Sequence, residues 1–139
     1  MRLFQQAIHK DPSDAIAYYD LGSAYQAAGN NQDALKQYRL ALARDPNEVS
    51  ALYNEAVIYS VHDSALAEFL YRKVIQLKPD SPTALLNLGL LLAVDGAKAQ
   101  AGVALRHAIK LDPTLRARIP ASVLVDLTAP PPKPRTTNG

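Results

Sequence analysis

Apolar residues recur along most of the chain at spacings of three and four, which places their side chains on one side of an α-helix. The pattern is interrupted at Gly29 and again at Gly96, and a glycine can end a helix by adopting positive φ. Each of these regions is therefore predicted to hold two amphipathic helices joined by a short turn. In the first region the apolar and small positions are Tyr18, Leu21, Gly22 and Tyr25, followed by Ala34, Tyr38 and Ala41.

A proline returns at a nearly constant interval along the chain. The four positions are Pro12, Pro46, Pro79 and Pro113, which lie 34, 33 and 34 residues apart. A period of this length is typical of stacked helical units, each too small to bury its apolar side alone. Each proline precedes a residue that can accept a hydrogen bond from the first turn of a helix, so a helix is predicted to start at each point. These four residues are Ser13, Asn47, Asp80 and Thr114.

The repeated positions resemble the signature of the tetratricopeptide repeat family, in which an aromatic residue or Leu, then Leu-Gly, Tyr, Ala, an aromatic residue, Ala and Pro recur. The resemblance extends from residue 2 to about residue 119. It implies an all-α, right-handed solenoid of antiparallel helical hairpins. Small residues are needed where the two helices of a hairpin cross closely, and they are Gly22, Ala56 and Gly89.

The second unit matches the signature less well than the first and third. Glu55 stands where Leu is expected, and one residue is missing near His62 and Asp63. A buried carboxylate would have a raised pKa and could mark a functional site. It could equally pair with a nearby basic or tyrosine side chain, or reach solvent, and then have no chemical role.

The periodic pattern predicts about three full repeats, at residues 13–46, 47–79 and 80–113. Residues 1–12 match the second helix of a repeat whose first helix is absent, which leaves an orphan helix with an uncovered apolar side. Either the chain is a fragment or a truncated gene product, or Leu3 and Phe4 pack against a second copy to make a homodimer.

After the last repeat, residues 114–127 are predicted to form a capping segment, with a helix that closes the stack. Leu115 and Ile119 would face the repeats, and the apolar stretch from Val123 to Leu127 could instead fill the chain's own groove. Residues 128–139 have the composition of a proline-rich, disordered tail.

Composition and charge exclude several classes of function. Fifteen basic and thirteen acidic residues give a net charge of +2, which disfavours a nucleic-acid surface. Without cysteine there can be no disulfide or thiolate metal site. The longest apolar stretch, from Leu85 to Val94, is about half of what a membrane span needs, and no signal-peptide pattern is visible. The compartment stays open, with the cytoplasm as the default.

The residue types that catalysis requires are scattered along the chain. His9, His62 and His107 are isolated, and none has a partner at the spacing of a metal site or a nucleophile–base pair. There is also no glycine-rich loop of the kind that cradles phosphate. We therefore predict that the chain is not an enzyme and has no catalytic, cofactor or metal site.

The family resemblance places function in the concave groove lined by the first helix of each repeat. It implies a protein or peptide partner, and the groove's apolar residues indicate that this partner is partly apolar. Asn54 and Asn87 could bracket an extended backbone, or could serve packing alone. The groove residues implied by the repeat spacing are Tyr19, Asp20, Ser23, Tyr53, Asn54, Val57, Leu86, Asn87, Leu90 and Val94.

Two other functions remain open at this point. The repeats could be a structural spacer or self-assembly segment of a larger multidomain protein, or a regulatory part of an enzyme. One subfamily of these repeats binds the terminal carboxylate of heat-shock chaperones through Lys, Asn and Arg side chains. Of the corresponding positions only Asn54 agrees with that pattern, whereas Tyr19 and Thr83 depart from it, so chaperone-tail binding is disfavoured.

Overall fold

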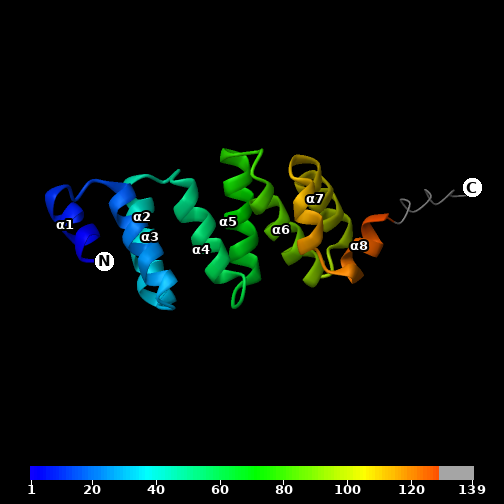
Figure 1. Ribbon diagram of the computed structural model, residues 1–139, viewed down its shortest axis with the longest axis horizontal. Helices are drawn as coiled ribbons and strands as arrows, with labels where there is room; N and C mark the ends of the chain where they lie inside the picture. Colours follow the sequence, from blue (N-terminus) through cyan, green and yellow to red (C-terminus); the bar gives the residue numbers. More distant parts are fainter. Residues whose placement is uncertain (129–139) are drawn as a thin grey trace, which may run out of the picture.

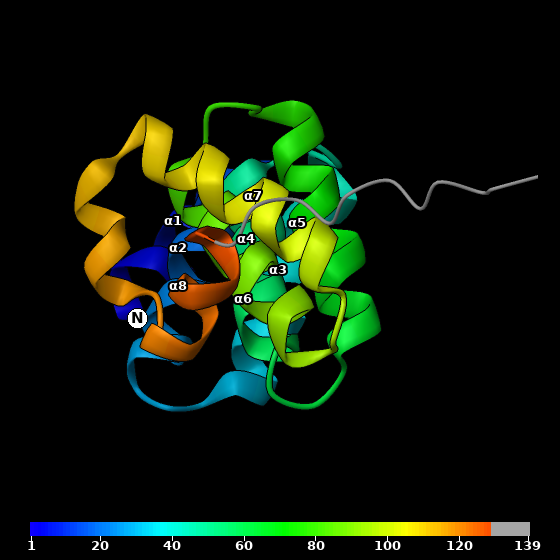
Figure 2. The same ribbon diagram turned by 90° about the vertical axis from the view of Figure 1, so that its right-hand side faces the viewer.

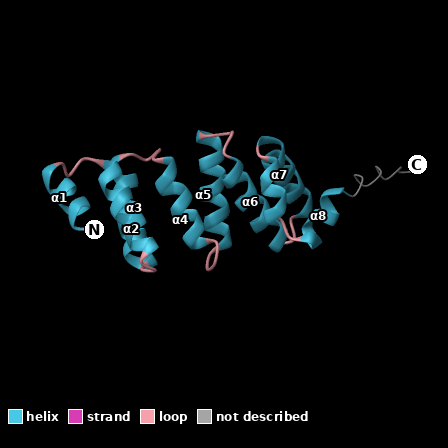
Figure 3. Cartoon of the chain, in the orientation of Figure 1, coloured by secondary structure: helices cyan, strands magenta, loops and turns pink. Residues whose placement is uncertain are grey.

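The computed structural model describes residues 1–128, and every regular element in that range is a helix (Figures 1 and 3). The all-α solenoid expected from the repeat pattern is confirmed. Residues 129–139, which make up nearly all of the expected tail, lie outside the described residues. The elements are α1 (Arg2–Lys10), α2 (Ala15–Ala27), α3 (Asn31–Arg44), α4 (Val49–Tyr59), α5 (Ser64–Leu77), α6 (Pro82–Val94), α7 (Lys98–Leu111), the 3₁₀ helix η1 (Pro113–Arg118) and α8 (Ala121–Thr128).

The helices form three hairpins, α2–α3, α4–α5 and α6–α7, which follow one another along the long axis of the molecule (Figure 1). Each helix packs mainly against its neighbours in the sequence, and α2 also touches α4. The view along the axis shows the hairpins stacked behind one another, with α8 at the near end (Figure 2). Stability in such an array comes from each hairpin and from the contacts between adjacent hairpins.

The turns inside the hairpins follow the predicted glycines. Gly29 has φ 78° and Gly96 has φ 80°, so both adopt the left-handed conformation that ends a helix at low cost. The middle hairpin turns without glycine, and the amide of Asp63 donates to the carbonyl of Tyr59 over 2.7 Å. This tighter turn accounts for the residue missing from the second repeat.

The first helices of repeats 1 and 2 begin one residue later than predicted. Asp14 and Glu48 are the N-caps, and their carboxylates accept from the amides of Ile16 and Ser50, each over 2.9 Å. Ser13, the expected cap, instead donates its hydroxyl and its amide to Asp11. Asp11 and Asp45, before the first two of the repeating prolines, thus form local turns that include the expected caps Ser13 and Asn47. In repeat 3 the N-cap is Ser81, also one residue later than predicted.

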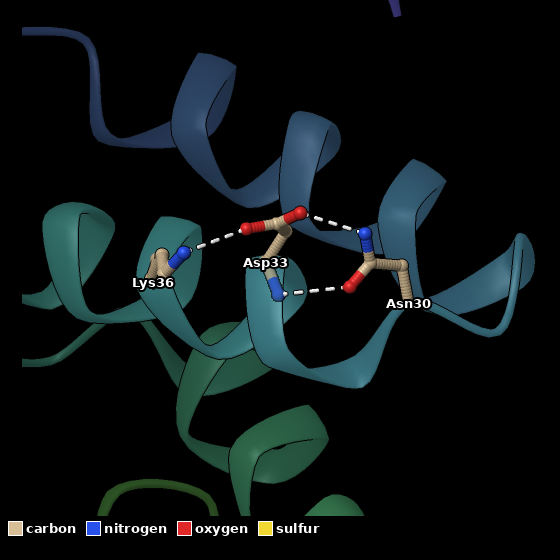
Figure 4. A network of polar contacts seen from close by, with 3 residues as sticks. All are labelled: Asn30, Asp33 and Lys36. Atoms are coloured by element: carbon tan, nitrogen blue, oxygen red, sulfur yellow. Dashed lines mark hydrogen bonds and ion pairs between the residues drawn. The ribbon is translucent and has the colours of Figure 1, made fainter.

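Helix α3 begins with a reciprocal cap. Asn30 Oδ1 accepts from the amide of Asp33 over 3.2 Å, and Asn30 Nδ2 donates back to the Asp33 carboxylate over 2.6 Å (Figure 4). Lys36 completes the network through an ion pair with the other oxygen of Asp33 at 2.9 Å. The equivalent helix of repeat 3, α7, follows Ala97 and has no side-chain cap among the described residues.

Close crossing of the two helices explains the small residues of the signature. A Cβ atom added to Gly22 would lie 2.6 Å from Cε1 of Tyr38, and one added to Gly89 would lie 2.5 Å from Cγ of Leu105. Ala56 is fully buried at the same point of the middle hairpin. The core therefore runs between the paired helices as a continuous series of apolar clusters.

The two ends of the stack are covered differently. At the N-terminus Phe4 is half-buried, while Leu3 remains 76 % exposed, as the orphan-helix pattern predicts. At the C-terminus Leu115 and Ile119 are buried, which confirms the prediction that they face the repeats. The predicted cap consists of a 3₁₀ helix and a separate short helix, α8, because Pro120 interrupts the segment.

Candidate protein-interaction surface

Tyrosine hydroxyls on the second helices connect successive repeats. Asn54 Nδ2, from α4, donates to the hydroxyl of Tyr38 on α3 over 3.1 Å. The same hydroxyl donates to Gln26 Oε1 over 2.6 Å, and Tyr19 stacks on the Tyr38 ring with a centroid separation of 6.0 Å. Burial raises the pKa of Tyr38, so its hydroxyl keeps the proton that it donates.

The next junction repeats this arrangement one hairpin further along. Asn87 Nδ2, from α6, lies 2.9 Å from the hydroxyl of Tyr53 and 3.4 Å from that of Tyr71, and donates to both. Burial raises the pKa of Tyr71 to about 12. The amide nitrogens of Asn54 and Asn87 therefore serve inter-repeat packing, which is one of the two roles the sequence allowed.

Two hollows lie beside these Asn–Tyr hydrogen bonds, and Tyr53 lines both. We call them the N-terminal and the C-terminal hollow, and together the groove. The N-terminal hollow has a volume of about 300 Å³ and is lined by Tyr19, Val49, Ser50, Tyr53, Asn54, Val74, Lys78, Ser81 and Thr83. The C-terminal hollow has a volume of about 510 Å³ and is lined by Tyr53, Val57, Ser60, Tyr71, Asn87, Leu90, Leu91, Val94 and Arg118.

Most of the groove residues expected from spacing line these hollows. Asp20 and Ser23 line neither, and the Ser23 hydroxyl lies 3.5 Å from that of Tyr38. Leu86 must be removed from the expected groove surface, because it is 0 % exposed in a cluster with Leu115 and Ile119. The seven residues that the structure brings together are Tyr19, Tyr53, Asn54, Val57, Asn87, Leu90 and Val94.

Sequence reasoning missed the two cations of the groove. Arg118 comes from η1, outside the repeat pattern, so repeat spacing gives no position for it. Lys78 was detectable, because it stands before Pro79 where the other three repeating prolines follow an Asp. That departure removes the local Asp turn and places a basic side chain at the N-terminal hollow.

The outer side of the first junction contains the one buried charged residue among the described residues, Glu55. Arg39 Nε donates to Glu55 Oε1 over 3.4 Å, and Arg39 also donates to the hydroxyl of Tyr59. Burial raises the pKa of Glu55, and the bond and charge of Arg39 oppose that rise without cancelling it. Glu55 thus pairs with a basic side chain, as one of the interpretations from sequence held.

The outer side of the second junction carries an apolar cleft of about 370 Å³ instead. Leu88 and Leu92 line it, at the positions equivalent to Glu55 and Tyr59. Arg72, the counterpart of Arg39, pairs with Glu68 at 2.8 Å and donates to Gln100 over 3.0 Å. The same residue type therefore makes different contacts at the two junctions.

The residues considered for chemistry are dispersed. His9, His62 and His107 are all exposed, and within residues 1–128 no group of three or more His, Cys, Asp or Glu side chains could hold a metal ion. No helix in this part of the chain is both long enough and apolar enough to cross a membrane.

Comparison with known proteins agrees with the repeat architecture. The family model described as "Tetratricopeptide repeat" matches residues 2–49, 19–82 and 59–115. The solved structure titled "Crystal structure of MamA" is similar to this chain, with a TM-score of 0.72 and 26 % sequence identity. That similarity covers 84 % of this chain and 68 % of MamA.

Two curated relatives match over most of this chain. Human protein O-mannosyl-transferase TMTC2 is 35 % identical over 114 residues, covering 76 % of this chain and 14 % of TMTC2. Photosystem I assembly protein Ycf3 of Acaryochloris marina is 37 % identical over 101 residues, covering 68 % of this chain and 60 % of Ycf3. The match thus spans less than two thirds of either relative's own length.

Proposed function

Because the chain belongs to the tetratricopeptide repeat family, we propose that it binds a segment of another protein in the groove. The observation that carries this proposal is a pair of hollows that share Tyr53 in their lining and together include residues from all three repeats. Seven of the ten groove residues that the family resemblance implied line these two hollows. An assembly role, as in the name of the relative Ycf3, would require such a surface.

The composition of the groove indicates which contacts would supply affinity. A hydrogen bond contributes about 1 kcal/mol net, whereas micromolar affinity needs about 8 kcal/mol. The amide nitrogens of Asn54 and Asn87 are already engaged with tyrosines. Most of the binding energy would therefore come from apolar contacts with Val57, Leu90 and Val94 in the C-terminal hollow.

A matched pair of substitutions tests the proposal. Val94 in the groove is 85 % exposed and Val103 on the outer side is 65 % exposed, so an Asp at either site disturbs the fold little. The whole chain carrying Val94→Asp or Val103→Asp is used as bait in cell lysate, after circular dichroism confirms equal helicity. We expect partners to be lost from V94D and retained by V103D, and equal loss or equal retention would contradict groove binding.

The self-filled groove predicted as the alternative receives less support. Val123 and Leu127 of α8 line a separate hollow of about 230 Å³ with residues of α6 and α7, and neither lines the groove. They pack against the cluster that contains Leu86. A chain ending at Ile119 should therefore be less stable than the whole chain, with unchanged partner affinity once folded.

A second candidate is self-association through α1. Leu3, on α1, and Met1, directly before it, are exposed at the N-terminal end of the stack, where α1 packs mainly against α2. Pairing of two copies would bury these side chains. Leu3→Gln should abolish a dimer seen by sedimentation, and a wild-type chain that stays monomeric at high concentration would exclude this candidate.

A further inference from the structure

Each hollow of the groove has a single cation at its edge and no anion. Lys78 lines the N-terminal hollow and Arg118 the C-terminal hollow, and none of the described lining residues is an Asp or Glu. Neither side chain forms an ion pair or a side-chain hydrogen bond within residues 1–128. Two positive charges are thus presented to whatever occupies the groove.

The position of Arg118 is set by the capping segment. Leu115 and Ile119 are buried against the third repeat, so the backbone of η1 is anchored on both sides of Arg118. Helix η1 ends at Arg118, whose side chain reaches the C-terminal hollow beside Val94. Arg116, two residues earlier on the same short helix, carries the same charge but lines neither hollow.

Apolar side chains make up much of the rest of the C-terminal hollow. Val57, Leu90, Leu91 and Val94 line it together with the ring of Tyr53. A volume of about 510 Å³ is ample for one or two apolar side chains of a partner. A guanidinium next to such a surface favours a carboxylate close in sequence to the apolar residue, because charge-assisted hydrogen bonds are stronger than neutral ones.

From this arrangement we propose that the groove recognises an internal, extended protein segment in which acidic residues flank an apolar one. The apolar side chain occupies the C-terminal hollow, one acidic side chain pairs with Arg118, and a second pairs with Lys78 across Tyr53. Each of the two separated cations can pair with one carboxylate, and an internal segment with acidic side chains on both sides of the apolar residue supplies both. This inference rests on the proposed function, since it specifies the ligand of the same groove.

A peptide library of random nine-residue segments, each enclosed by glycine-serine linkers, tests the proposal against the whole chain. We expect selected sequences to be enriched in Asp and Glu within a few residues of Leu, Ile or Phe. An amidated synthetic copy of the best sequence should bind Arg118→Gln about tenfold more weakly, the size of one charge-assisted hydrogen bond. Lys78→Gln should give a smaller loss, because a Lys presents a point charge without a bidentate fork.

The controls separate failure of this inference from failure of groove binding. Arg116→Gln removes the same charge from the same helix and should leave affinity unchanged, whereas Val94→Asp should abolish binding. Peptides that V94D rejects but that show no acidic enrichment, or no response to R118Q, overturn the acidic ligand and leave groove binding intact. Peptides that bind V94D as well as wild type overturn both the acidic ligand and groove binding. Equal losses of peptide affinity in R116Q and R118Q would show that only the net charge matters, and would overturn the pairing of an acidic side chain with Arg118.

Discussion

The two junctions between repeats use the same solution on the groove side and opposite solutions on the outer side. In the groove, an Asn of the following repeat donates to a buried tyrosine hydroxyl at both junctions, Tyr38 at the first and Tyr71 at the second. On the outer side, Arg39, Glu55 and Tyr59 close the first junction with polar contacts. The second junction leaves a cleft between apolar side chains.

The difference shows that a residue's role is set by what faces it. Arg39 and Arg72 occupy the same position of successive repeats. Arg72 contacts the following repeat through Gln100 on its second helix, α7, whereas Arg39 contacts the first helix of the following repeat, α4. It does so because the next repeat offers Glu55 and Tyr59, whereas Arg72 meets Leu88 and Leu92 and turns to Glu68. Glu55, which departs from the Leu of the repeat signature, is therefore the partner of Arg39 in an ion pair.

The largest expected effect comes from breaking that pair on one side. Arg39→Leu leaves the buried Glu55 without its cation, and we expect the free energy of unfolding to fall by about 2 kcal/mol at neutral pH. Arg72→Leu removes the equivalent arginine from an exposed pair and should cost less than about 0.5 kcal/mol. Urea denaturation of both variants measures the difference, and equal losses would show that the two junctions are energetically alike.

Removing both partners should restore much of the loss. In the double variant Arg39→Leu/Glu55→Leu the first junction acquires the apolar character of the second, and no charge remains buried. Stability is expected to return to within about 1 kcal/mol of wild type, because replacing a buried ion pair by apolar residues is often neutral. A double-mutant cycle gives the coupling energy, and additive losses from the two single variants would mean that Arg39 and Glu55 do not stabilise each other.

Removing the tyrosine hydroxyls that bind Asn54 and Asn87 should change the free energy of unfolding by similar amounts at the two junctions. Tyr38→Phe removes a hydroxyl that contacts Gln26 and Asn54, and we expect a loss of about 1.5 kcal/mol in the free energy of unfolding. Tyr71→Phe removes a longer bond to Asn87, which keeps Tyr53 as a second acceptor, and should cost about 1 kcal/mol. Thermal unfolding of the two variants ranks them, and a larger loss at Tyr71 would reverse the assignment of the stronger tie.

The smallest effect is a pH dependence confined to the first junction. The folded pKa of Glu55 lies above its ordinary value of 4.5, so the stability it contributes is complete below pH 4.5 and is lost as pH rises through the folded value. The stability of Glu55→Gln relative to wild type should therefore increase from pH 4 to pH 7. Glu68→Gln, in the exposed pair of the second junction, is the control, and a flat difference for E55Q would mean that the carboxylate is solvated.

The sequence predicted the parts of the molecule that local rules determine. Proline spacing located the hairpins, and Gly22 and Gly89 marked the close helix crossings. The caps of the first two repeats were misplaced by one residue. Asp11 and Asp45 accept from the amides of Ser13 and Asn47, so a local turn competes with a helix start at these two residues. This competition is local, so it could have been anticipated from the Asp-Pro motif.

The errors at the groove have a different cause. Leu86 occupies a position that faces the groove in a regular repeat, but the capping segment folds over it and buries it. Arg118 enters the C-terminal hollow from that same segment. Repeat periodicity cannot place residues that lie outside the repeats. The burial of Leu86 and the position of Arg118 both depend on how the capping segment packs against α6 and α7.

The outer cleft between Leu88 and Leu92 has a mechanical consequence. In a stack of hairpins the curvature is the sum of small rotations between neighbours, so the compliance of each junction sets how easily the molecule bends. The first junction has polar contacts to a buried carboxylate on its outer side, whereas the outer side of the second is an apolar cleft spanned by the exposed hydrogen bond from Arg72 to Gln100. We expect bending to concentrate at the second junction, which would make the C-terminal hollow the adjustable half of the groove. Amide hydrogen exchange that is faster in α6 than in α4 would support bending at the second junction. Equal protection of the amides in the two helices would mean that both junctions are equally rigid.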